Sequence, residues 1–312
     1  MKCNCNESCI EKKEELLSDI DNLYKPCLKC HTKKFKKAIP LKRQIKLSKL
    51  DANLYKCDNC RKRHIDIVMA HVLKILIENK QISESASLRQ LGTPLITPAI
   101  YLESLPYLSE KSLVIITTSC DKETAGTIIE KVPEIKAILR GNIENTVGIL
   151  NENVETNTYE LLSGCDISCD IQNTDKGPII IYKNQSKIHI EYPKKESQKI
   201  IQLKGVLEKY ENPTVIDAMC GPGTLGIYAL LSNAKKVLFN DIYGESLDAL
   251  KTNLTVNNMN PESYEIRNEN ILNLADVLEN HYDIALIDAF PDVDTSGYIK
   301  SLENVCDEVV II

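Results

Sequence analysis

The chain of 312 residues is 43% hydrophobic and 26% charged, which is ordinary for a globular protein with two or three domains. A transmembrane protein is excluded, because no stretch approaches the roughly 20 apolar residues of a membrane span. A secreted protein is not expected, because the polar start, Met1-Lys2-Cys3, lacks the apolar core of a signal peptide. We therefore expect a soluble, cytoplasmic protein without membrane contact.

Charge is distributed unevenly along the chain, whose formal net charge is −6. Residues 1–65 hold 17 Lys and Arg against 8 Asp and Glu, a net charge of +9, whereas residues 66–312 hold 21 against 36, a net charge of −15. A basic arm on an acidic body indicates contact with a polyanion such as RNA. The alternative is a charged surface that is merely solvated.

Cysteines are concentrated near the N-terminus, since seven of the twelve lie within the first 60 residues. In a long chain without a signal peptide, this clustering favours metal binding over disulfides. Two C-x-x-C pairs, Cys27 with Cys30 and Cys57 with Cys60, could together close a tetrahedral Zn²⁺ site with four thiolates. Such a closed site is structural, because small domains fold around the ion.

Residues 39–50, between the two pairs, are basic and partly alternating, which predicts the strands of a zinc ribbon. A redox centre or an Fe–S cluster is the alternative, and it could also use Cys3, Cys5 or Cys9. Cys165 and Cys169 are close enough in sequence to raise a second metal site, although small core residues are the simpler interpretation.

Hydrophobic periodicity predicts helices over 11–24 and 64–79, followed by a proline-containing boundary at 83–108. A strand, a helix and a strand come next, at 113–117, 122–131 and 135–139. Further short strands predict an antiparallel sheet, at 147–150, 158–162, 179–182 and 188–192. We thus expect four parts: a Cys-rich zinc-ribbon arm at 1–65, a connecting helix and loop at 66–108, an α/β plus antiparallel middle domain at 109–195, and a C-terminal domain at 196–312.

Residues 215–226 predict a buried strand, a glycine turn and the start of a helix. Asp217 ends the strand, and Gly221 and Gly223 allow the backbone to bend tightly and to approach a ligand. A bland packing role for this strand-turn-helix unit is the alternative. A second strand at 236–240 then ends at Asp241, in the position where an acid can accept both hydroxyls of a ribose.

The turn after the first of these strands opens with an acid, whereas dinucleotide-binding turns normally open with a glycine. An acid suits a ligand that carries an ammonium group and no pyrophosphate. S-adenosylmethionine (SAM) is such a ligand.

Four motifs occur in order in the C-terminal half: Asp217-Ala-Met-Cys-Gly-Pro-Gly-Thr, Phe239-Asn-Asp241, Leu250-Lys-Thr-Asn253-Leu-Thr-Val-Asn257 and Asp283-Ile-Ala-Leu-Ile-Asp288-Ala-Phe-Pro291. Their order resembles that in class I SAM-dependent methyltransferases, and in particular in the tRNA (guanine-N1)-methyltransferase and wyosine-synthesis family of archaea and eukaryotes. A looser resemblance extends back to about residue 110 and leaves out the zinc-ribbon arm.

The resemblance implies an α/β fold, with a Rossmann-like, doubly wound parallel sheet in the SAM-binding methyltransferase domain at 196–312. Its remaining elements are expected as a helix at 195–210, a helix at 247–257 capped by Ser246, and strands at 264–267, 282–287 and 308–312. The sheet looks shortened after its fifth strand, unless strands of the middle domain cover that edge. Pairing of this apolar edge with a second copy would give a homodimer.

The residues expected at SAM are Asp217, Cys220, Gly221, Gly223, Asp241 and Asn270. Asp217 would face the ammonium group, Asp241 the ribose hydroxyls and Asn270 the adenine, at a place where the resembled family carries an acid. Asp288 ends the fourth strand and would accept a hydrogen bond or a proton from the acceptor. Each of these side chains could instead serve as a turn or cap residue.

The combined expectation is a SAM-dependent methyltransferase that modifies a base in tRNA or another RNA. The turn Asp288-Ala-Phe-Pro291 differs from the Asn-Leu-Pro type of the resembled family, so the target atom is left open. The alternative is a SAM-dependent transferase for a protein or a small biosynthetic intermediate, in which the zinc ribbon docks a partner. Transfer of the aminocarboxypropyl group and binding without catalysis are further variants.

Overall fold

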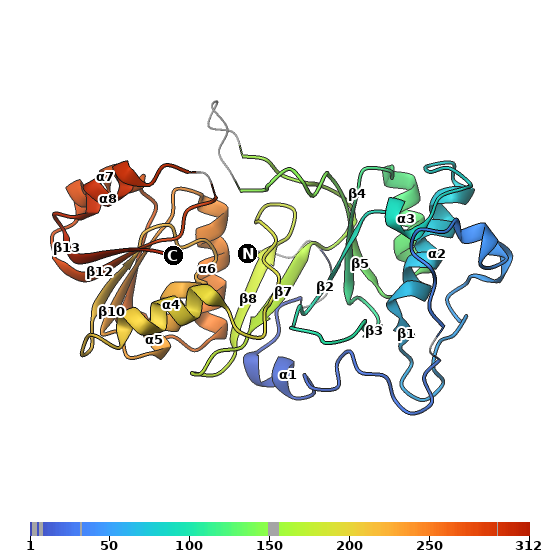
Figure 1. Cartoon of the computed structure of the whole chain (residues 1–312), viewed down its shortest axis with the longest axis horizontal. Coiled ribbons are helices and arrows are strands. Elements are labelled where there is room, and N and C mark those ends of the chain that lie inside the picture. The colour runs from blue at the N-terminus through green and yellow to red at the C-terminus, as the bar shows by residue number, and fades with distance from the viewer. Residues whose placement is uncertain (2–4, 6–8, 32, 149–155, 292) are drawn as a thin grey trace. The chain divides into compact units, whose positions relative to one another are not determined.

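The computed structural model describes residues 1, 5, 9–31, 33–148, 156–291 and 293–312 (Figure 1). The chain divides into two compact units, which are described separately. The C-terminal unit comprises Met1, 169–184 and 191–312, and the N-terminal unit comprises 2–168 and 185–190. Within the described residues, every helix is too short or too polar to cross a lipid bilayer. The finer division into four parts stays a prediction.

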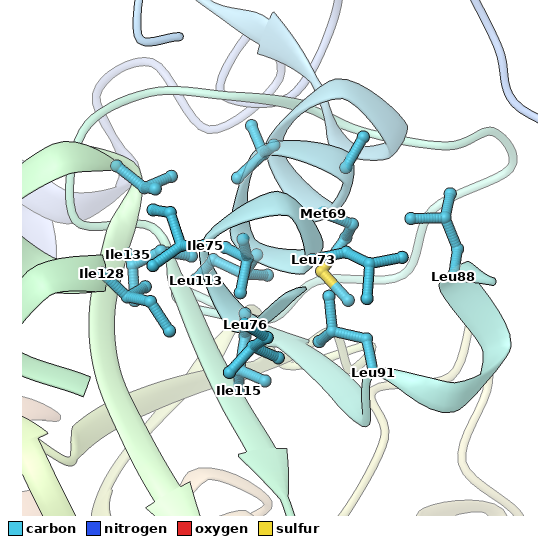
Figure 2. Packing of buried hydrophobic residues seen from close by; sticks show 14 of the residues in the cluster. Met69, Leu73, Ile75, Leu76, Leu88, Leu91, Leu113, Ile115, Ile128 and Ile135 are labelled. Atoms are coloured by element: carbon cyan, nitrogen blue, oxygen red, sulfur yellow. The ribbon is translucent and has the colours of Figure 1, made fainter. Parts of the chain in front are cut away.

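The N-terminal unit is built around the helix α2 (Ile65–Glu78), which confirms the helix expected over 64–79. All of its residues except Lys74 and Glu78 are buried, as is usual for a helix that is apolar on all sides. Figure 2 shows its side chains packed among residues from the following turn, strand and helix, namely Leu88, Leu91, Leu113, Ile115, Ile128 and Ile135.

A mixed sheet of four strands, in the order β2-β4-β5-β6, completes this unit. Its strands are β2 (Thr93–Ile96), β4 (Leu113–Thr117), β5 (Ile135–Arg140) and β6 (Glu160–Gly164). β4 and β5 are parallel and are connected by α3 (Lys122–Lys131), as the sequence predicts, while the outer strands are antiparallel to them. The strand expected at 147–150 lies partly outside the described residues, and β2 was not expected.

Two short elements follow α2, the 3₁₀ turn η3 (Leu88–Gln90) and the two-residue strand β3 (Tyr107–Leu108). The N-terminal arm contains short elements only: α1 (Lys13–Leu17), the 3₁₀ turns η1 (Leu41–Arg43) and η2 (Leu47–Lys49), and the two-residue strand β1 (Arg63–His64). The prediction of zinc-ribbon strands within 39–50 is therefore wrong. Its apolar residues reach the core from 3₁₀ turns, since Leu41 and Leu50 are fully buried. The alternating pattern at 39–50 therefore reflects apolar side chains that are buried in the core from 3₁₀ turns, and not a β-strand.

The C-terminal unit contains a parallel sheet of five strands in the order β11-β10-β9-β12-β13. The strands are β9 (Thr214–Asp217), β10 (Lys236–Asn240), β11 (Tyr264–Arg267), β12 (Tyr282–Ile287) and β13 (Cys306–Ile311). This confirms the Rossmann-like parallel sheet and all five of its expected strands. β13 lies at one edge, and its pairing with a second copy stays a prediction.

Successive apolar side chains of these strands point to opposite faces of the sheet. Helices therefore cover both faces (Figure 1). One core is shared with α4 (Gln198–Leu207), α5 (Thr224–Leu231) and α6 (Gly244–Val256). The other is shared with α7 (Ile271–Leu274) and α8 (Ser296–Leu302). Short 3₁₀ turns, η4 (Pro261–Ser263) and η5 (Ala275–Val277), precede β11 and follow α7. α6 begins at Gly244, so the expected cap at Ser246 is wrong, and Ser246 is buried inside the helix.

A separate two-stranded sheet lies in the region where the sequence predicts an antiparallel sheet. Its strands are β7 (Ile167–Gln172) and β8 (Ile179–Asn184). β7 was missed, and no strand forms at 188–192, where one was expected. Backbone groups of β8 are instead bonded by two buried amides of α6. Asn257 bonds both N–H and C=O of Ile180, at 3.0 and 2.7 Å, and Asn253 bonds those of Tyr182, at 2.8 and 3.1 Å.

Candidate functional site

The four arm cysteines converge as the sequence predicts. The Sγ atoms of Cys27, Cys30, Cys57 and Cys60 all lie within 4.8 Å of one another. Cys27 lies 3.5 Å from Cys57, and Cys30 lies 3.3 Å from Cys60. Four thiols at these separations match the donor set of one tetrahedral ion, because sulfur atoms bound at about 2.3 Å are roughly 3.8 Å apart.

Tight backbone turns present each pair of thiols. The amide of Cys30 donates to the carbonyl of Cys27 at 3.0 Å, and that of Arg61 donates to the carbonyl of Cys57 at 2.8 Å. A backbone N–H of Lys29 donates to the Cys27 sulfur and is the main reason why the pKa of that thiol is lowered to about 6. The pKa of the Cys60 thiol is also lowered, with a backbone hydrogen bond from Lys62 as the main lowering cause, so hydrogen bonding within the arm favours thiolate at two of the four positions.

The segment between the cysteine pairs is a strongly basic surface, which we call the basic segment and define as residues 33–49. It contains no acidic residue, and its eight Lys and Arg side chains are all exposed: Lys33, Lys34, Lys36, Lys37, Lys42, Arg43, Lys46 and Lys49. The buried Phe35 and Leu41 anchor it to the core of the N-terminal unit. The arrangement holds cations in solvent on a fixed support.

Asp217 is the most enclosed acid of the C-terminal unit. Its side chain is 1% exposed, and its Oδ2 accepts a hydrogen bond of 2.8 Å from the backbone N–H of Gly226, near the start of α5. Its Oδ1 is buried without a hydrogen-bond partner among the described residues. Burial raises the pKa of Asp217 to about 7, and the nearby Asp288 and Asp241 act in the same direction. A cationic ligand would offset the buried charge of Asp217 and would provide a partner for its Oδ1.

Two glycines shape the loop between β9 and α5, and a third lies in the first turn of α5. Gly221 adopts φ +53° and has open space where a Cβ would be, so its backbone can approach a ligand. Gly223 adopts φ +101°, and a Cβ there would lie 2.4 Å from Leu250. Gly226 was not predicted as a functional residue. A Cβ on it would lie 2.2 Å from the Phe239 ring and 2.9 Å from Asp217 Oδ2.

Asp241 follows β10 and braces the glycine loop. Its Oδ2 accepts from the N–H of Gly221 and its Oδ1 from the N–H of Tyr243, each at 2.8 Å. Each carboxylate oxygen retains a second lone pair, so the group can still accept ribose hydroxyls. Burial also raises the pKa of Asp241. The position of Asp241 beside the glycine loop could therefore be predicted from the sequence. Its hydrogen bond from the N–H of Gly221 could not.

Asn240, the last residue of β10, was missed. Its buried amide donates to the carbonyls of Ala218 and Glu269, each at 3.0 Å, and accepts from the Glu269 N–H at 3.0 Å. It thereby ties together the segments that follow three neighbouring strands. The motif Phe239-Asn-Asp241 contained the signal, but an amide inside a strand has no functional signature of its own.

Asn270 caps α7, since its side chain accepts from the N–H of Leu272 at 3.0 Å. The cap interpretation of this residue is therefore realised, and the residue is exposed. Cys220 is 7% exposed, and burial raises the pKa of its thiol well above the usual range. It therefore contributes as an apolar wall.

Asp288, at the end of β12, is paired with a cation that the sequence did not reveal. Lys199 Nζ lies 2.7 Å from Asp288 Oδ2 and 3.8 Å from Glu191 Oε1. Burial raises the pKa of Asp288, while Lys199 opposes that shift. Glu191 thus lies near Asp288, since both contact Lys199.

Asp217, Asp241 and Asp288 all lie at the carboxyl ends of neighbouring parallel strands, where ligands of such sheets bind. Together with the open Gly221 and the orphaned Asp217 oxygen, they fit a cationic nucleoside such as SAM. When bound, SAM supplies an activated methyl group. The chain itself supplies carboxylates at the carboxyl ends of the strands and the Lys199–Asp288 pair beside them.

One family model matches part of the C-terminal unit. Residues 199–288 match the family model described as ribosomal protein L11 methyltransferase (PrmA). The match spans all three acids and confirms the resemblance to methyltransferases over this segment. No curated protein sequence matches the chain.

Solved structures are similar at low identity. A complex of aTrm5 with tRNALeu has 15% identity and a TM-score of 0.43 over 76% of this chain and 62% of that one. Trm5b from Pyrococcus abyssi has 16% identity and a TM-score of 0.42 over 69% and 57%. TYW2 from P. horikoshii in complex with MeSAdo has 17% identity and a TM-score of 0.48 over 78% of each chain. The chain therefore spans about six tenths of the length of the first two.

Proposed function

We propose that the protein is a SAM-dependent methyltransferase that acts on a base of tRNA or another RNA. The observation that carries the SAM assignment is the buried Asp217, whose raised pKa and orphaned oxygen call for a cation at the carboxyl end of β9. The glycine loop, Asp241 and Asp288 complete a crevice of matching chemistry. A cytoplasmic location fits an enzyme of this kind.

Within the crevice, we assign Asp217 to the ammonium group, directly or through water. Asp241 would accept the ribose hydroxyls, with Cys220, Gly221 and Gly223 lining the ligand. Asn270 would contact the adenine with its amide nitrogen. Asp288, held by Lys199, would face the acceptor and accept a hydrogen bond or a proton.

The basic segment supports an RNA substrate. Its exposed cations would contact phosphates, which give affinity without sequence preference and make binding fall steeply with salt. Four arm thiols would hold a structural Zn²⁺ that fixes the ends of this segment. The zinc ion would therefore act in substrate binding and not in the chemical step.

The test uses purified full-length protein, SAM labelled in the methyl group and unfractionated tRNA. We expect label in tRNA, and we expect Asp241→Ala to weaken SAM binding in isothermal titration while Glu303→Ala, which changes an exposed acid just before β13, does not. A change of the four residues Lys33, Lys34, Lys36 and Lys37 to Ala should weaken tRNA binding and flatten its salt dependence. Unlabelled tRNA together with salt-independent binding would overturn the RNA proposal.

A second candidate function is favoured by the family match to a ribosomal protein methyltransferase and by the three acids at the crevice, which suit an amine acceptor. In that case the arm would dock a partner protein. Label that resists RNase and is lost to protease would support this candidate. Label from the carboxyl carbon of SAM, rather than from its methyl group, would indicate aminocarboxypropyl transfer.

A further inference from the structure

A second group of cysteines lies apart from the four arm thiols. The Sγ atoms of Cys5, Cys9 and Cys165 all lie within 4.8 Å of one another. Cys5 is 3.1 Å from Cys9, and Cys9 is 3.5 Å from Cys165, although Cys165 is 156 residues further along the chain. All three belong to the N-terminal unit, and none of the described cysteines forms a disulfide. Cys169 is not a member of this group.

The separations of these thiols, 3.1 and 3.5 Å, are close to those of the four arm cysteines, whose neighbouring sulfur atoms are 3.3 to 3.8 Å apart. In both groups the sulfur atoms converge on one point, as ligands of a single ion do. We propose that Cys5, Cys9 and Cys165 bind a second Zn²⁺ ion through three thiolates; among the described residues no fourth ligand belongs to this group.

The backbone fixes Cys165 for this role. Gly164, the last residue of β6, adopts φ +87°, and a Cβ there would lie 2.1 Å from the carbonyl oxygen of Lys136. The N–H of Cys165 donates to that same carbonyl at 2.9 Å. The thiol is thus held at the end of a sheet strand, 9% exposed, where a thiolate needs a cation to offset its loss of hydration.

A single ion accounts for the geometry better than two other cysteine products. In an Fe–S cluster the cysteines are divided among at least two iron atoms, so three bound sulfur atoms would not all lie within 4.8 Å of one another as these do. A disulfide would use two of the three thiols and leave the third unexplained. Zn²⁺ also needs no redox partner, and thiolates are among its preferred ligands.

The second ion would join the start of the chain to the sheet of the N-terminal unit. Cys5 and Cys9 precede α1, while Cys165 follows β6. A crosslink over so long a stretch of chain removes much conformational freedom from the unfolded state. The ion would therefore stabilise the N-terminal unit as a whole, unlike the arm ion, which closes a local loop.

Metal content of the full chain tests the proposal. We expect about two zinc ions per chain by mass spectrometry after removal of loosely bound metal. Cys9→Ser and Cys165→Ser should each lower the content to about one, as should Cys60→Ser through the arm site. Cys120→Ser changes a buried thiol outside both groups and should leave the content unchanged.

Cobalt substitution keeps the test decisive if a variant is unstable. Wild-type protein titrated with Co²⁺ should develop thiolate-to-metal charge-transfer absorption in two steps, and Cys165→Ser should abolish one of them. Only variants with the circular dichroism of wild type are compared. One zinc ion in the wild type, iron with acid-labile sulfide, or a Cys5–Cys9 disulfide in non-reducing peptide maps would each overturn the proposal.

Discussion

At the scale of single residues, Asp217 lowers the stability of the ligand-free protein at neutral pH. Its pKa is near the usual acid value when the chain is unfolded and about 7 when it is folded, so the folded state binds the proton more tightly. The stabilisation from this proton is fully present below about pH 4 and is lost as the pH rises through 7.

We therefore expect Asp217→Asn to raise the free energy of unfolding at pH 8 by up to about 4 kcal/mol, since one pKa unit corresponds to about 1.4 kcal/mol. The same change should weaken SAM binding. Denaturant unfolding without ligand at pH 5 and pH 8 measures the effect. Asp283→Asn is the matched control: the pKa of Asp283 is lowered by hydrogen bonds from Thr214, so its stability effect should have the opposite sign. A destabilised Asp217→Asn at pH 8 would contradict the account.

Gly226 gives a second prediction at this scale. Gly226→Ala should destabilise the protein by about 1–3 kcal/mol, because the added Cβ would meet the Phe239 ring and Asp217 between fixed elements. Gly205→Ala provides the control. It lies inside α4 with nothing within 4 Å of a Cβ, so it should be neutral or stabilising by about 0.5–1 kcal/mol. Equal thermal stability of the two variants would refute the packing argument.

Residue roles could be predicted from the sequence only where a motif fixes a position. Asp217, Asp241 and the two expected glycines follow strand ends, and parallel strands bring such ends together. Lys199 could not be predicted, because a Lys in an amphipathic helix carries no sign of the Asp that it will meet in space. Asn270 could be placed but not interpreted, since an amide after a strand can cap a helix or bind a ligand.

At the scale of elements, the pair of amides on α6 replaces a neighbouring strand for β8. Asn257→Ala would leave the buried N–H and C=O of Ile180 without partners, at a cost of about 1–3 kcal/mol for each unsatisfied group. Thr255→Ala, on an exposed turn of the same helix, should change stability by less than about 0.5 kcal/mol. Urea unfolding compares the stabilities of the two variants. A similar loss of stability in both would show that the Asn257 amide does not hold β8 against α6.

Helices and parallel strands with strong periodicity were predictable, whereas the short elements were not. α2, α3 and the five parallel strands fall where the apolar patterns place them. Periodicity did not predict the arm or β7. The buried apolar residues of the arm lie in or beside 3₁₀ turns, and those of β7 belong to a short strand and the loop beside it. The Asn253 and Asn257 spacing puts both amides on one face of α6, but nothing in the sequence names β8 as their partner.

At the scale of the whole molecule, each compact unit has its own hydrophobic core, and the proposed zinc sites lie in one unit whereas the proposed SAM site lies in the other. We expect two transitions in calorimetric unfolding. SAM should stabilise the C-terminal unit only. At a hundred times its dissociation constant, it should raise the free energy of unfolding of that unit by about 2.7 kcal/mol. A zinc chelator should lower the other transition only. A single transition that responds to both additions would show that the units unfold together.

The path of the chain through β8 has a practical consequence for anyone who subclones the catalytic half. Residues 169–184 belong to the C-terminal unit, although the chain then leaves that unit and returns at Glu191. A gene fragment that starts at codon 196 would omit the partner of two interior carboxamides and expose the apolar flank of α6. Recombinant pieces that include 169 onward should stay in solution, while shorter ones should precipitate.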